Sequence, residues 1–222
     1  MNTPKLLAAL VVVTALVGPM ACADSFAFTN NQAIPDGQPA GVSDVETITS
    51  GISQIGAVQV SLNISGDFNG DLYCYLQHSN ALSVLLNRPG RTAGNTFGYA
   101  DSGFNLTLMD LSTNGNIHTY QGMVTPAAGQ PLTGVWSPDG RTTSPASVLD
   151  TDPSLAGLSL FNNMNASGNW TLFIADLSPG GTSVLTSWQL NFLPVPEPSV
   201  EAMGVLGFGV FALVRNREKK FP

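Results

Sequence analysis

Apolar and polar residues alternate with a period of two through much of the chain between residues 24 and 193. In residues 55–64, IGAVQVSLNI, the alternate positions from Val58 to Ile64 are apolar and those between them are Gln, Ser and Asn. This is the pattern of a strand with one buried face. Further strand-like segments are residues 45–49, 72–76, 83–86, 104–109, 170–175 and 187–192.

Turn-forming residues separate these segments, as in Arg88-Pro89-Gly90 and in residues 178–181, SPGG. No stretch between residues 24 and 193 keeps an apolar period of 3.6. Several short strands with Gly, Pro and Asn between them predict an all-β sandwich or barrel. Residues 137–154 are rich in Ser, Thr, Asp and Pro, and they predict a loop over the surface.

The first 23 residues have the features of a secretory signal peptide, which predicts an N-terminal signal helix. Lys5 precedes an apolar run over residues 6–17, and Ala21 and Ala23 form a small-x-small site for signal peptidase. We therefore expect the mature chain to begin at Asp24. The alternative is a lipoprotein attached through Cys22.

The last segment, residues 194–222, joins a Pro196-Glu197-Pro198 corner, an apolar run over residues 202–214 and a basic end. The apolar run has 13 residues, fewer than the roughly 20 that span a bilayer core, so we expect a short hydrophobic helix. The cations that follow favour a cytoplasmic C-terminus. The alternative is a terminal core helix with a solvated basic end.

In this order of parts, the tail resembles a PEP-CTERM sorting signal. The resemblance implies recognition by a membrane-embedded exosortase, cleavage near Pro196, Glu197 and Pro198, and transient contact with the inner membrane. It also implies delivery to the surface or extracellular matrix of an exopolysaccharide-producing Gram-negative cell.

Charge and cysteine content describe what remains after both ends are removed. Residues 24–198 contain 13 acidic residues, three arginines and no lysine, a formal charge of −10. Such a surface disfavours nucleic acid and anionic lipid as partners. Cys74 is the single cysteine after residue 23, so an internal disulfide is excluded, and its strand-like context predicts a buried thiol.

The body, residues 24–193, resembles the P domain (P/Homo B) that follows the catalytic domain in proprotein convertases and bacterial subtilisin-like proteases. The resemblance rests on Ile34-Pro35-Asp36, Gly41-Val42-Ser43, Gly70-Asp71-Leu72, residues 134–138 and, above all, residues 167–192. It implies a jelly-roll-like β-sandwich of about eight strands. Trp170 and Trp188, each followed two residues later by a leucine, are expected to be core residues on paired strands.

A candidate calcium site is the run Asp67-Phe68-Asn69-Gly70-Asp71, whose oxygen ligands alternate. The run lacks the glycine and the later glutamate of an EF-hand, and Gly180-Gly181-Thr182 lacks a carboxylate that the P-domain family commonly carries. The alternative is a hydrogen-bonded turn capped by Asp71. Further carboxylates for such a site would come from Asp36, Asp101 and Asp176.

Catalytic signatures are not found in the sequence. The two histidines, His78 and His118, are expected in a hairpin turn and a loop, and neither lies beside a nucleophile motif. No paired cysteines or His-x-x-x-His spacing indicates zinc. The sequence therefore favours a protein that is not an enzyme.

Three functions fit these observations. The first is a non-catalytic exported surface or matrix protein. The second is a glycan- or calcium-binding module of an exopolysaccharide matrix, with Tyr99, Tyr120 and Trp136 as contact aromatics if they are exposed rather than in the core. The third is a protease-associated P domain that acts with a separate serine peptidase.

Overall fold

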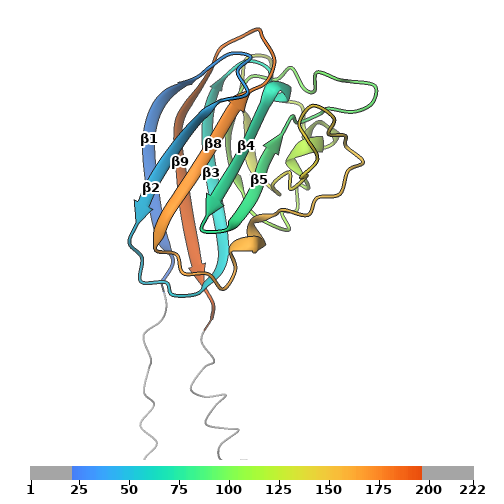
Figure 1. The fold of residues 1–222 in the computed structure, drawn as a ribbon. Helices are drawn as coiled ribbons and strands as arrows, with labels where there is room; N and C mark the ends of the chain where they lie inside the picture. Colours follow the sequence, from blue (N-terminus) through green and yellow to red (C-terminus); the bar gives the residue numbers. More distant parts are fainter. Residues whose placement is uncertain (1–21, 197–222) are drawn as a thin grey trace, which may run out of the picture. The chain divides into compact units, whose positions relative to one another are not determined.

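The computed structural model describes residues 22–196, which form a β-sandwich of two sheets (Figure 1). One sheet has the order β1-β9-β3-β6-β7 and the other the order β2-β8-β4-β5. The strands are β1 (Asp24–Ile34), β2 (Val42–Ile48), β3 (Ile55–Gly66), β4 (Leu72–His78), β5 (Ala81–Asn87), β6 (Phe104–Leu108), β7 (Leu132–Trp136), β8 (Gly168–Asp176) and β9 (Ser183–Pro194). Helical structure within residues 22–196 consists of the 3-10 turns η1 (Asn69–Asp71), η2 (Ile117–Gly122) and η3 (Leu158–Phe161).

Eight of the nine strands form a jelly roll. Without β7, the two sheets run β1-β9-β3-β6 and β2-β8-β4-β5, and all their pairs are antiparallel, as expected of two packed Greek keys. The prediction of an all-β, jelly-roll-like sandwich of about eight strands is confirmed. The ninth strand, β7, adds to the edge of the larger sheet in parallel with β6.

Two strands were not predicted, and both depart from simple alternation. In β1 the exposure of the side chains alternates throughout, but the inward positions that follow Phe26 and Phe28 are the polar residues Asn30 and Gln32. The apolar alternation that marks a strand is therefore missing from its second half, where the register also shifts between Thr29 and Gln32. The other strand, β7, has five residues with Gly134 in the middle, and its pairing with β6 is not evident from local sequence.

The core lies between the two sheets. Trp170 on β8 and Trp188 on β9 are both buried, but they belong to different sheets, so the expectation of paired strands is wrong. The Trp170 ring lies 5.0 Å from the Phe192 ring of the opposite sheet and 5.0 Å from the Phe161 ring of η3. Cys74 is fully buried, as the sequence predicted.

The segment over residues 137–154 is more buried than the sequence predicted. Asp139 and Val148 are fully buried and Arg141 is 6% exposed. The backbone N–H groups of Asp139 and Gly140 donate to carbonyl oxygens of β5. The prediction of a surface loop is therefore wrong for this part, because the segment covers the free edge of the smaller sheet.

Both ends of the sandwich leave from the same side of the fold. β1 begins at Asp24, which pairs with Phe192 near the end of β9 (Figure 1). The predicted signal peptide lies outside the described residues except for Cys22 and Ala23, which are exposed. The predicted tail also lies outside them beyond Pro196. Across residues 22–196, no helix is long and apolar enough to cross a membrane.

Candidate functional site: an apolar groove beside the larger sheet

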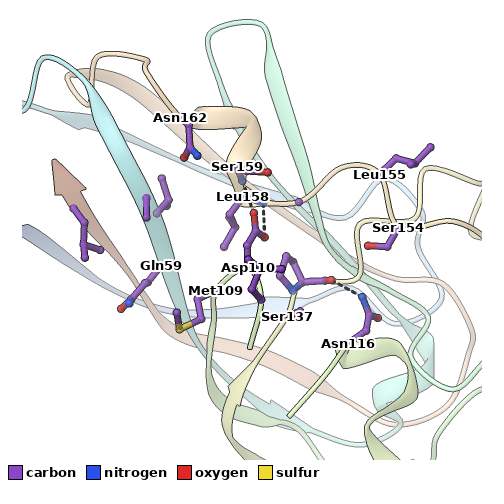
Figure 2. A pocket seen from close by; sticks show the side chains of 16 residues that line it. Gln59, Met109, Asp110, Asn116, Ser137, Ser154, Leu155, Leu158, Ser159 and Asn162 are labelled. Atoms are coloured by element: carbon purple, nitrogen blue, oxygen red, sulfur yellow. Dashed lines mark hydrogen bonds between the residues drawn. The ribbon is translucent and has the colours of Figure 1, made fainter. Parts of the chain in front are cut away.

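The main candidate site is a groove of about 710 Å³ where the outer face of the larger sheet meets η3 (Figure 2). This is within the size range of ligand-binding clefts. Its walls come from β3, β9, η3 and the loops that follow β6 and β7. The lining residues are Ala57, Val58, Gln59, Met109, Asp110, Leu111, Asn116, Ser137, Pro138, Ser154, Leu155, Gly157, Leu158, Ser159, Asn162 and Leu193.

Asp110 is the single charged residue of the groove lining, and it is held by η3. Its Oδ1 accepts from the Leu158 N–H at 2.9 Å and its Oδ2 from the Ser159 N–H at 2.6 Å. Both bonds satisfy donors at the start of a helical turn that would otherwise lack partners. The carboxylate therefore fixes η3 against the loop after β6, and its hydrogen-bonding capacity is largely used within the protein.

Leucine side chains dominate the rim of the groove. Leu111 is 95% exposed and Leu155 is 70% exposed, and Leu193 is 38% exposed. Exposed apolar residues gathered around one cleft indicate contact with an apolar partner. Sequence reasoning missed them, because Leu111 and Leu155 are isolated leucines in polar loops that carry no periodic signal, and these loops meet Leu193 of β9 only in the folded chain.

The predicted calcium run leads into the turn η1, and its three oxygen-bearing side chains all contact protein groups. The Asn69 amide is buried and exchanges hydrogen bonds with the backbone of Gly103, at 2.7 Å and 3.1 Å. Asp71 is bonded to Arg88, while Asp67 lies in an exposed contact with Ser102. Within residues 22–196, no group of three or more His, Cys, Asp or Glu residues is placed to hold a metal ion.

Arg88 joins η1 to the turn before β9. Its Nε donates to the Gly70 carbonyl at 3.0 Å, and its Nη2 donates to Asp71 Oδ1 at 3.3 Å and to Ser178 Oγ at 3.0 Å. Arg88 itself has a positive φ of 52°, a strained region for a residue with a side chain. These contacts offset the strain and hold two loops together at this end of the sandwich.

Burial shifts the pKa values of Asp71, Asp176 and Arg88 in the direction that favours their neutral forms. Burial raises the pKa of Asp71, although the contacts with Ser178 and Arg88 act in the opposite direction. Burial also raises the pKa of Asp176, and the negative charges of Asp71 and Asp36 add to the shift. The pKa of Arg88 is lowered, again chiefly by burial. In the Arg88–Asp71 ion pair, the cost of burial opposes the attraction between the charges. The pair therefore fixes the positions of the two loops more than it stabilises the fold.

Neither histidine ring is hydrogen-bonded to a nucleophilic side chain. His118 lies in η2 with Nδ1 at 2.8 Å from Asp139 Oδ2 and Nε2 at 3.0 Å from the Arg91 carbonyl. Asp139 Oδ1 in turn bonds the guanidinium of Arg141 at 3.2 Å. All three side chains are buried or nearly so, which makes this cluster part of the interior.

His78 ends β4 and stacks on the indole of Trp170, with ring centres 4.1 Å apart and planes 4° from parallel. Its two ring nitrogens each lie 2.9 Å from a backbone carbonyl, those of Asn169 and Asn165. The ring therefore joins the β4–β5 hairpin to the chain entering β8.

The three aromatics expected to contact a ligand if exposed are largely inside. Tyr120 and Trp136 are buried, and Tyr99 packs against the core with its ring 4.6 Å from that of Tyr120. The expectation of exposed contact residues is wrong for Tyr120, which faces inward from η2, and for Trp136, which is a buried residue of β7, whereas Tyr99 is half-buried. The outward aromatic cluster is instead Tyr73, Tyr75 and Phe173, on β4 and β8.

Comparisons with known proteins assign no family to the chain. No family model and no curated protein matches it. A solved structure of the Aeromonas sobria serine protease in complex with the chaperone ORF2 is 15% identical, with a TM-score of 0.42, over 81% of this chain and 28% of that chain. A structure of serine protease of Aeromonas sobria is 16% identical, with a TM-score of 0.41, over 80% of this chain and 28% of that chain. The chain thus spans under a third of either solved chain, and the similarity is too low to assign a family.

Proposed function

We propose that the protein is a non-catalytic β-sandwich, exported through its signal peptide and sorted by an exosortase through Pro196, Glu197 and Pro198. The observation that carries the proposal is the match between the fold and the predicted processing sites. The sandwich begins at Asp24, directly after Ala23, and its last strand ends at Pro194, two residues before the Pro-Glu-Pro corner. Removal of both ends would therefore leave every strand intact.

The proposed destination is the cell surface or extracellular matrix of a Gram-negative bacterium. The body carries a formal charge of −9 and no lysine, which suits a soluble exported domain with no affinity for anionic lipid. Both histidines are used in interior contacts, which supports a role in binding or assembly over catalysis.

The test is the intact mass of the mature protein isolated from its own host. We expect a species that begins at Asp24 and ends near Pro198. A Glu197→Ala variant should accumulate uncleaved at its C-terminus in the inner-membrane fraction. Glu201→Ala, which changes a neighbouring carboxylate outside the corner, is the matched control and should be processed normally. An unchanged mass and location for Glu197→Ala would overturn the sorting proposal.

A second candidate function, association with a separate serine peptidase, is favoured by the groove. Exposed Leu111 and Leu155 would form the contact. Leu155→Asp should then abolish co-purification of the peptidase, whereas Phe97→Asp should not, since Phe97 is 74% exposed but does not line the groove. Equal recovery of peptidase with both variants would remove this candidate.

A further inference from the structure

The outer face of the larger sheet carries a straight row of hydroxyl and amide side chains. The strand registers place five such residues opposite one another, one from each strand. In order across the sheet they are Thr29 (β1), Ser187 (β9), Asn63 (β3), Asn105 (β6) and Thr133 (β7). With strands about 4.8 Å apart, the row is about 19 Å long. We call it the polar row.

The polar row differs from the row beside it in its hydrogen bonding. In the neighbouring row, Ser61 Oγ and Thr107 Oγ1 are 2.9 Å apart, and Gln189 Nε2 donates to Ser25 Oγ and Asn191 Oδ1. None of the five side chains of the polar row has a hydrogen-bond partner among residues 22–196. Each amide offers two donors and an acceptor, and each hydroxyl offers both functions. The row therefore presents a line of uncommitted hydrogen-bonding groups to solvent.

The face around the polar row is also uncharged. The outward residues of β1, β9, β3, β6 and β7 are Ser, Thr, Asn, Gln and small or aliphatic residues. The acidic residues that give the body its charge lie in loops, in η1, at the start of β1, on the inner side of β2 and at the end of β8. A neutral face within an acidic molecule gives a polyanion no attraction, and the surrounding charge repels it.

We propose that the polar row is a binding track for an uncharged polysaccharide. Such a chain presents hydroxyl groups at regular intervals along its length, and these match a line of amides and hydroxyls that can both donate and accept. Water-mediated bonds would add to the direct ones on a flat, wet surface. Export, as proposed above, would bring the row to a polysaccharide-containing environment, so the biological role rests on that proposal.

The experiment uses the body, residues 24–196, because residues 22–195 form one compact unit with its own core. Native gel electrophoresis in gels containing dextran, mixed-linkage β-glucan, galactomannan or acidic alginate measures retardation against polysaccharide concentration. We expect at least one of the three uncharged polymers to retard the body and alginate to have no effect. Asn63→Asp and Asn105→Asp, made singly, should each weaken binding about tenfold, since each replaces amide donors by a charge.

Gln77→Glu is the matched control, because it makes the same amide-to-carboxylate change at an exposed strand residue of the smaller sheet. It should bind as the parent does. Asn105→Ala, at an exposed position, provides a charge-free test if an aspartate variant fails to fold. The proposal is overturned if no uncharged polymer retards the body, if Gln77→Glu weakens binding equally, or if the Asn63 and Asn105 variants bind normally. It is also overturned if the only effect of these variants is to dissociate a dimer of the body.

These outcomes can be separated from failure of the sorting proposal. The body is purified without the signal peptide and the tail, so its binding does not depend on processing. If the Glu197→Ala protein isolated from the host had the same mass as the parent, the sorting proposal would fail and the gel result would still hold.

Discussion

Replacing Asp139 by Asn should strongly destabilise the sandwich. The Asp139 carboxylate is fully buried and accepts from His118 Nδ1 at 2.8 Å and from the Asn87 N–H at 3.1 Å. It also accepts from Arg141, at 3.3 Å from the backbone N–H and 3.2 Å from Nη1. These contacts join β5, η2 and the covering segment over residues 137–154. In the asparagine variant, one acceptor becomes an NH₂ group that faces donors.

The magnitude follows from the charge left without a partner. The Arg141 side chain is 7% exposed, and removal of the Asp139 carboxylate leaves a buried cation. Breaking a buried ion pair on one side costs about 3–5 kcal/mol. For a domain of this size each kcal/mol lowers Tm by about 2–4 °C, so we expect Tm to fall by about 6–20 °C.

Urea unfolding followed by tryptophan fluorescence measures this loss, because Trp136, Trp170 and Trp188 are all buried in the native state. Asp150→Asn is the matched control, since the Asp150 side chain is exposed, and it should change the free energy of unfolding by about 0.5 kcal/mol or less. A loss below about 1 kcal/mol for Asp139→Asn would refute the view that the cluster holds the covering segment in place.

Three further predictions concern other buried groups. Burial raises the pKa of Asp176, so the native state binds a proton more tightly than the unfolded chain, and stability should decline as pH rises above about 4, the usual pKa of an aspartate in an unfolded chain. Asp176→Asn should flatten this dependence of Tm on pH, and an identical profile in both proteins would contradict the assignment. Because burial raises the pKa of the Cys74 thiol, Ellman's reagent should find no reactive thiol in the native body and one in urea; a full native reaction would contradict this. If Asn69 and Asp71 serve the η1 turn alone, EDTA should leave Tm unchanged, whereas a drop in Tm that Asp71→Ala abolishes would favour calcium.

The strands that were predictable have either an alternating pattern, as in β3, or a short run of apolar residues, as in β5. Residues 55–64 fall within β3, and the other predicted segments each lie within one residue of a strand. One face of each strand packs against the opposite sheet, so the residues on that face are apolar and the sequence shows the pattern. The missed strands depend instead on long-range pairing: β7 is defined by its contact with β6, and no local pattern marks it.

The candidate site was harder to predict because its parts are distant in sequence. The groove brings Leu111, Leu155 and Leu193 together from three separate segments. Sequence placed Tyr120 and Trp136 among possible contact residues because nothing local shows whether a loop aromatic turns inward. In the structure Tyr120 donates to Asp101 Oδ2 at 2.6 Å, so its polar end is satisfied while its ring remains in the core.

The polar row could be predicted only in part, unlike the alternating strands, which were predictable, and the groove, which was not. Alternation alone identifies Asn63 as an outward position of its strand, and it would do the same for Asn105. It does not show that they are neighbours, because a shift of the β3–β6 register by two residues would keep both outward and separate them. Register here is fixed by core packing, since Leu62 and Leu106 on the inner face pair with each other in the same ladder. The core that specifies the fold therefore also aligns the surface row, and a binding function on that face would depend on buried residues that never contact the ligand.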